Sequence, residues 1–370
     1  MDNVTHTLFA VTLARTPLGR AGRGTLATLV IASNAPDIDI VAAARGVTSY
    51  LAWHRGPTHG PLGIVVLGLI SAGVVWLGRS VVDRRRATAE PVAAGNASFA
   101  MLASLAMLGV LFHVLMDLPT SYGTRILSPF DWHWFAVDWL PIIDIYLLAI
   151  LLVGLVLAEL SRSSRRRIAA IVLMLIAVDY GVRAVAHRQA LALAPRLFGP
   201  HLPAWCDPRR PTPRIDSWPR DEMRSAAREG PCLLEIAAVP TFASPFRWRV
   251  IAHLSNAYEL HEVDVLDGRF TRPADPVEAF WRRAVRYPNQ WTPATVAAAR
   301  SQTAQVFLGF SRFPAARVYT DPAGLATVRW NDMRFVGGVY SLADRRPDPF
   351  NLVVRVGPDG RPIEETLGRR

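Results

Sequence analysis

Long uncharged apolar stretches fill the first half of the chain and predict membrane-spanning helices. The first lies in residues 61–81 and begins with PLGIVVLGLISAGVVWLG, eighteen residues without a charge. The second covers residues 97–117, where ASFAMLASLAMLGVLFHVLM is interrupted only by a histidine. About 20 apolar residues suffice for a helix to cross the hydrocarbon core of a bilayer. Both stretches are therefore predicted spans.

Further apolar segments enlarge this predicted helical bundle. Residues 139–160 and 168–187 predict two more spans, each of which carries a few charged residues. Residues 4–14 and 24–41 are shorter, so they predict half-spans or helices packed against the bundle. We expect an integral membrane bundle of about four to six helices.

The last part of the chain has a different pattern. Runs such as FRWRVIAHL and ATVRWNDMRFVGG lie between Gly, Pro and Asp turns, as half-buried antiparallel strands do, and a helical stretch, TPATVAAARSQTAQVFLGF, interrupts them. The sequence therefore predicts three regions. They are a helical transmembrane domain over residues 1–190, a Pro/Arg-rich linker over 191–217, and an α+β or mainly β accessory domain over 218–370.

Arginine positions predict the orientation of the bundle. Arg84, Arg85 and Arg86 lie between the two strong spans, and a second arginine group at 162–167 lies between the two later spans. Short loops rich in arginine stay in the cytoplasm, so the loops at 46–60 and 118–138 should lie outside. The chain then leaves its last span on the outer face, and the accessory domain is predicted to be extracytoplasmic. Cysteines 206 and 232 both lie in this half, where a disulfide between them is one open possibility.

Charge adds little about partners beyond the membrane. The net charge is +11, and all 41 cationic side chains are arginine. Anionic lipid or a GC-rich genome accounts for this balance, and no zinc-finger spacing or aromatic RNA-binding motif accompanies it. We expect the lipid bilayer as a partner and no nucleic acid, while any protein partner of the accessory domain stays unknown.

Histidine and aspartate residues collect at the predicted outer ends of the apolar helices. Each alone has an ordinary explanation, such as helix capping or a position at the membrane interface. Seven ionisable side chains at one level of the membrane cost free energy unless they are paired. Their number therefore favours a functional cluster. The seven are His6, Asp37, Asp39, His54, His59, His113 and Asp117.

The types and spacing of these residues point to a metal ion. His113 and Asp117 are four residues apart, so on a helix both side chains project from one face and can hold one cation. Imidazole and carboxylate ligands suit zinc, manganese or iron better than calcium. Asp37 and Asp39 follow a proline, so they converge only in a turn or extended segment, or serve two metals. Arg55, in the turn RGPTHGP, is expected to contact an anionic substrate group.

Four sequence elements resemble a known family. MDNVTH at the start, PDID at 36–39, HRGPTH at 54–59 and HVLMDLPTSYGTRILSPF at 113–130 are similar to the membrane-bound metal-dependent hydrolases of the bacterial inner membrane, a family with a LexA-regulated member. The resemblance covers about the first 145 to 190 residues. The arrangement also resembles, more loosely, the metal sites of zinc phospholipase C and P1-type nucleases. Gly60 departs from the family pattern, which usually has serine there.

The resemblance implies a metal-dependent hydrolase located in the bacterial inner membrane as a multi-pass protein. A divalent metal, zinc first and manganese second, would be held by the seven His and Asp residues and would activate water. Asp39 or Asp37 would act as the base for this water or as a bridging ligand. Arg55 would stabilise the negative charge that develops on the substrate. The expected substrate is a phosphoester or a lipid-like ester at the outer membrane–water interface. The alternative is a non-catalytic, membrane-anchored protein that binds metal or recognises a partner.

Overall fold

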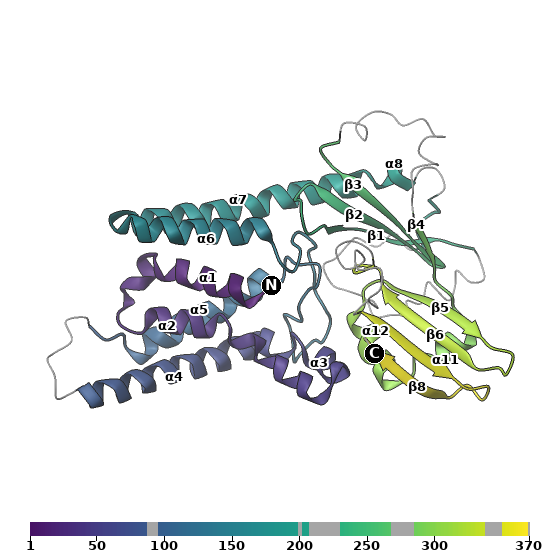
Figure 1. Cartoon of the computed structure of the whole chain (residues 1–370), viewed down its shortest axis with the longest axis horizontal. Coiled ribbons are helices and arrows are strands. Elements are labelled where there is room, and N and C mark those ends of the chain that lie inside the picture. Colours follow the sequence, from purple (N-terminus) through teal and green to yellow (C-terminus); the bar gives the residue numbers. More distant parts are fainter. Residues whose placement is uncertain (87–94, 199–201, 207–229, 268–284, 337–349, 369–370) are drawn as a thin grey trace. The chain divides into compact units, whose positions relative to one another are not determined.

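The computed structural model describes residues 1–86, 95–198, 202–206, 230–267, 285–336 and 350–368. Residues 207–217 of the predicted linker lie outside these ranges. The chain divides into two compact units (Figure 1). One consists of Met1–Ala42 and Trp53–Val182, and the other consists of Ala43–Ala52 and Arg183–Arg370.

The named elements in the described part of the first unit are all helices (Figure 1). Its long helices run side by side, and short 3₁₀ segments connect them. In chain order the elements are α1 (Asn3–Ala14), η1 (Pro17–Ala21), α2 (Thr25–Ala32), η2 (Ala35–Arg45), α3 (Val47–Trp53), η3 (Pro57–His59), α4 (Pro61–Arg86), α5 (Phe99–Asp117), α6 (Ile145–Leu160), η4 (Arg162–Ser164) and α7 (Arg165–Ala192). The last residues of η2, all of α3 except Trp53, and the part of α7 from Arg183 onward belong to the second unit.

Four helical segments of the described chain are long and apolar enough to cross a membrane. They are Thr25–Arg45, Pro61–Arg85, Phe99–Asp117 and Arg162–Phe198. Their outward residues are apolar and exposed, as lipid contact requires. The predicted helical membrane bundle is thus confirmed.

Helix α6 begins later than the predicted span at 139–160. The carboxylate of Asp144 accepts hydrogen bonds from the backbone N–H groups of Tyr146 and Leu147, which caps the helix there. Residues 139–144 are non-helical, and the remaining helix has 16 residues. The predicted start was wrong because this aspartate is a capping residue and not the first polar residue inside a span.

Two buried clusters hold the helices of the first unit together. Ala72 and Val75 of α4 pack against Leu102 and Ala106 of α5. A second cluster joins α1, α5, α6 and α7, with Leu151 among its fully buried members. Packing between membrane helices depends on close van der Waals contact, because lipid tails are as apolar as leucine and supply no hydrophobic driving force.

The second unit contains two four-stranded sheets in which every neighbouring pair of strands is antiparallel. The first sheet has the order β1 (Leu233–Pro240), β2 (Arg247–Leu254), β3 (Ala257–Asp264), β4 (Val285–Pro288). The second has the order β5 (Pro314–Thr320), β6 (Ala326–Asp332), β7 (Asn351–Val356), β8 (Pro362–Leu367). Two short helices, α11 (Pro293–Ala298) and α12 (Gln302–Phe310), contact the second sheet. The predicted α+β or mainly β region is confirmed.

The end of α7 forms part of the core of the second unit. Ala186 and Ala190 of α7 share a buried cluster with Trp248 and Val250 of β2. Helix α8 (Ala194–Phe198) contributes to the same cluster. The first sheet therefore packs against the C-terminal part of α7 within this unit. A disulfide joins cysteines 206 and 232 beside β1, which settles the open question of their pairing.

The contact between α6 and α7 predicts that Gly154→Ala destabilises the bundle. A Cβ atom at Gly154 would lie 2.1 Å from Cγ2 of Val172, and overpacking of this kind costs about 1–3 kcal/mol. Gly181→Ala in α7 is the matched control, because a Cβ atom there meets nothing within 4 Å. Thermal unfolding in detergent should give a lower midpoint for Gly154→Ala and an unchanged or higher midpoint for Gly181→Ala. Equal midpoints for the two variants would contradict this packing.

Candidate metal centre

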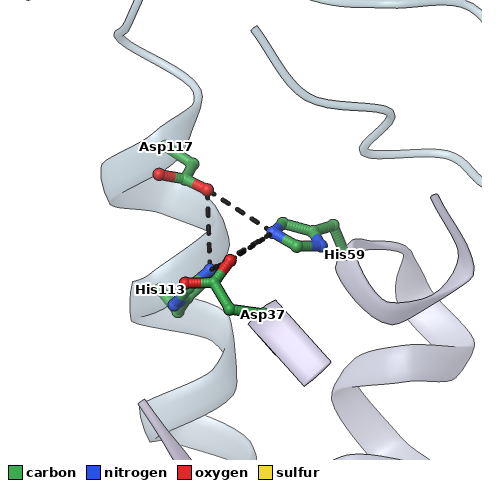
Figure 2. A group of neighbouring side chains, drawn as sticks. All are labelled: Asp37, His59, His113 and Asp117. Carbon is green, nitrogen blue, oxygen red and sulfur yellow. Dashed lines mark hydrogen bonds and ion pairs between the residues drawn. The ribbon is translucent and has the colours of Figure 1, made fainter. Parts of the chain in front are cut away.

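Four ionisable side chains converge at one end of the membrane helices (Figure 2). Asp37 lies on η2, His59 ends η3, and His113 and Asp117 lie on the last two turns of α5. One ligand atom of each residue lies within 4.8 Å of the other three. The Asp37 side chain is 18% exposed, whereas the other three are completely buried. This group could hold a metal ion.

Five of the six distances between the ligand atoms are close to those of a tetrahedral metal site, and the sixth, between Asp37 and Asp117, is within 4.8 Å. Nε2 of His59 lies 3.2 Å from Nε2 of His113 and 3.4 Å from Oδ2 of Asp117. Nε2 of His113 lies 3.5 Å from the same carboxylate oxygen. Oδ1 of Asp37 lies 3.6 Å from the His113 nitrogen and 3.8 Å from the His59 nitrogen. Four ligands at about 2.1 Å from a zinc ion lie about 3.4 Å from one another.

Hydrogen bonds to the far nitrogens of the two imidazoles turn their lone pairs toward the centre. Nδ1 of His113 lies 2.8 Å from the carbonyl oxygen of Ser33, which can only accept, so this nitrogen carries the proton. Nδ1 of His59 lies 3.0 Å from Oγ1 of Thr58, whose hydroxyl can in turn donate to Asp39 at 3.4 Å. When the Thr58 hydroxyl donates to Asp39, Nδ1 of His59 carries the proton and both Nε2 atoms of the neutral rings lack one. Two such nitrogens 3.2 Å apart cannot hydrogen-bond to each other, but they can share a cation.

Asp117 has one oxygen for the centre and one for its support. Oδ1 forms an ion pair with the amino group of Met1 and lies 3.1 Å from Nη2 of Arg55. Oδ2 is buried and has no hydrogen-bond partner. A buried carboxylate oxygen without a partner is costly in a protein interior, and a metal ligand position would satisfy it.

His6 lies beside the group of four but is not part of it. Its ring stacks on that of His113 with a centroid distance of 3.8 Å, and its Nε2 lies 3.5 Å from Oδ1 of Asp117. Neither ring nitrogen has a hydrogen-bond partner. Burial, and next the neighbouring His113, hold the pKa of His6 well below its usual value, so the ring is neutral. A neutral buried imidazole at this place can serve as a further ligand.

Asp39 and His54 form a pair next to the group. Oδ1 of Asp39 lies 3.1 Å from Nδ1 of His54, and Oδ2 accepts the backbone N–H of Arg55 at 2.7 Å. In a 3₁₀ helix residues two apart point in different directions, which separates Asp39 from Asp37. Desolvation by burial lowers the pKa of His54. Neither Asp39 nor His54 contributes to the four-residue group, and Asp39 instead supports the turn that carries His59.

Arg55 is buried and its guanidinium bonds to protein atoms. Nη1 donates to the carbonyl oxygen of Gly123 at 2.7 Å, and the guanidinium lies 4.9 Å from the centroid of the Tyr122 ring. Its backbone φ is 52°, a left-handed conformation that costs a non-glycine residue about 1 kcal/mol. This conformation directs the backbone N–H to Asp39 and the side chain to Asp117. The observed contacts make Arg55 a support for Asp117.

The departure at Gly60 has a steric reason. A Cβ atom at this position would lie 1.6 Å from the backbone carbonyl oxygen of Ser128. The loop after α5 therefore occupies the space that a serine side chain would need. In this chain glycine allows the loop to approach the turn that carries His59.

Some contributors to the site were not identifiable from the sequence. The carbonyl of Ser33 orients His113, and any residue type could supply a carbonyl, so no sequence signal marks it. The amino group of Met1 is a second example. Two other polar residues have separate roles, since Asp144 caps α6 and His133 pairs with Asp131.

The supporting role of Asp39 predicts that Asp39→Asn weakens metal binding without removing a ligand. Loss of a residue that orients a metal ligand typically costs about 10–100-fold in affinity. We expect a zinc dissociation constant raised by that factor, measured by competition with a fluorescent chelator. Asp131→Asn is the matched control, because Asp131 pairs with His133 and not with the group of four. Identical zinc affinities for both variants and the wild type would contradict this role.

Comparisons with known proteins found one curated relative and one family. A protein of Bacillus subtilis (strain 168), described as "Uncharacterized protein YfhP", is 29% identical over 119 residues. These residues are 32% of this chain, and the match spans about a third of that relative's own length. No solved structure matches this chain. The model of the family described as YdjM inner membrane protein matches residues 1–190, which is just over half of the chain. The chain therefore belongs to the YdjM inner membrane protein family.

Proposed function

We propose that this membrane protein is a metal-dependent hydrolase with its reactive centre at Asp37, His59, His113 and Asp117. The supporting observation is the convergence of two imidazole lone pairs and a carboxylate oxygen that lacks a hydrogen-bond partner. A divalent ion, zinc first and manganese second, supplies the Lewis acidity that activates water and polarises an ester oxygen. Nitrogen and carboxylate ligands without cysteine are typical of such catalytic zinc sites.

The side chains around the centre have different proposed roles. Asp37 is the partly exposed member, so it is the carboxylate that can take a proton from attacking water or bridge to a second ion. Arg55 keeps Asp117 oriented, and Asp39 keeps the His59 turn in place. His6 is positioned as an additional ligand next to Asp117. In this proposal the positive charge of Arg55 also offsets the negative charge that develops on an ester oxygen.

The proposed location is the outer face of the bacterial inner membrane. His59 directly precedes α4, and His113 and Asp117 end α5, so the site lies at the ends of these helices opposite the arginines at 84–86, which the positive-inside rule places in the cytoplasm. The disulfide between Cys206 and Cys232 supports an oxidising, extracytoplasmic compartment for the second unit. The proposed substrate is a phosphoester or a lipid-like ester at the membrane–water interface.

One observation favours the alternative of a non-catalytic metal-binding or partner-recognition protein. Three of the four ligands are completely buried, as in a closed structural site. A structural metal would have all its positions filled by protein, whereas a catalytic metal keeps one for water or substrate. The absorption spectrum of the cobalt-substituted protein distinguishes them, because added phosphate or thiocyanate changes it only when a position is open.

The proposal predicts that hydrolysis depends on His113. His113→Ala removes a ligand, so turnover of a dissolved phosphodiester such as bis(p-nitrophenyl) phosphate should fall at least about 100-fold. His133→Ala is the matched control, since His133 pairs with Asp131 in the outer loop. It should retain turnover close to that of the wild type, because the half-buried His133–Asp131 pair does not belong to the group of four. Similar turnover by His113→Ala and the wild type would rule out this centre as the active site.

A further inference from the structure

The metal centre is surrounded by exposed apolar side chains on the side from which it can be reached. Among the four candidate ligands only Asp37 has appreciable exposure. Asp37 lies on η2, and three residues per turn place Ile40 directly one turn beyond it on the same face. Ile40 is 64% exposed. The next face of η2 carries Ile38 and Val41, which are 58% and 67% exposed.

The lipid-facing sides of α4 and α5 reach the same level as the ligands. Leu62 and Val65 are exposed in the first turns of α4, directly after His59. On α5, Leu111 and Leu115 are exposed with a spacing of four, and Leu115 lies two residues before Asp117. The hydrocarbon region must therefore extend to the height of the metal centre, because exposed leucine and valine on a membrane helix face lipid.

Aromatic side chains mark the level of the headgroups near this point. Trp53 directly precedes His54, which pairs with Asp39 of η2. The Trp53 ring contacts the Trp132 ring at a centroid distance of 5.7 Å, and both rings are exposed. Tryptophan concentrates at the boundary between hydrocarbon and headgroups. The Asp39–His54 pair connects η2 to the segment that follows Trp53, so the exposed apolar residues of η2 are expected to lie in the leaflet and not in water.

From these placements we infer that Ile38, Ile40 and Val41 of η2 insert into the outer leaflet, and that the centre opens through Asp37 into the lipid phase. Substrates then enter sideways from the bilayer, with the ester group at Asp37 and an acyl chain along Ile40. The class that fits is a membrane lipid with an ester or phosphoester at the headgroup boundary. The entry route rests on the proposed hydrolase function, whereas the insertion of η2 does not.

The insertion is tested by site-directed spin labelling. The chain has two cysteines and both are in the disulfide, so a single introduced cysteine takes a thiol-specific nitroxide. Ile40→Cys is labelled and reconstituted in vesicles of phosphatidylethanolamine and phosphatidylglycerol. Collision rates are measured with oxygen, which partitions into lipid, and with chromium oxalate, which stays in water. Val66→Cys on the lipid face of α4 and Gln302→Cys on α12 are the lipid and water references.

The insertion predicts an oxygen-to-chromium collision ratio at position 40 close to that at 66 and several-fold above that at 302. A ratio at 40 equal to that at 302 would overturn the inference. Ile38→Cys and Val41→Cys repeat the measurement if the first variant does not fold, since both positions are exposed. This outcome is independent of any enzymatic activity.

The entry route is tested by Ile40→Asp. A charge placed in the leaflet opposes lipid entry, so turnover of phospholipid in the same vesicles should fall about tenfold relative to turnover of dissolved bis(p-nitrophenyl) phosphate. An unchanged ratio, with both substrates hydrolysed by the wild type, would refute lateral entry and leave the hydrolase intact. Failure of the wild type to hydrolyse either substrate would refute the hydrolase function and the entry route together, and the spin labels would still decide the insertion.

Discussion

Two imidazole nitrogens that face each other at hydrogen-bond distance organise this site. Nε2 of His59 and Nε2 of His113 lie 3.2 Å apart, and the partners of the opposite ring nitrogens direct both lone pairs inward. Neutral nitrogens at this distance repel unless a cation lies near both. Oδ2 of Asp117 faces the same point without a hydrogen bond. A divalent ion would resolve all of these unsatisfied groups at once, and the surrounding residues are arranged as its supports.

The helical bundle explains how such polar groups can exist next to a membrane. Each of the four residues lies at or near the end of a helical segment, where the chain leaves the apolar region. Arg55 supplies positive charge to Asp117 and the amino group of Met1 contacts the same carboxylate, so the buried carboxylate is not left alone. Ionisable groups in this environment persist when they are paired or have a function. The sheets of the second unit pack on apolar cores, and its buried Asp332 is likewise paired, in this case with Arg334.

Regular features of the structure were predictable from short-range sequence patterns. Lengths of apolar runs predicted α4 and α5, and the spacing of His113 and Asp117 placed both on one helix face. Alternating strands predicted the sheets of the second unit. Asp37 belongs to the group of four, whereas Asp39 bonds to the backbone of Arg55. This difference was not predictable, because it depends on η2 being a 3₁₀ helix. The role of Ser33 was not predictable either, because its backbone carbonyl oxygen, and not its side chain, bonds to His113.

The measurement that tests the central claim most directly is the metal content of the purified protein. Inductively coupled plasma mass spectrometry on protein purified in detergent without added metal, then after incubation with zinc or manganese and desalting, gives the number of ions per chain. The account predicts about one or two ions per chain in the wild type and in His133→Ala, and a loss in His59→Ala and His113→Ala. No bound metal in the wild type, even after incubation with zinc or manganese, would contradict it.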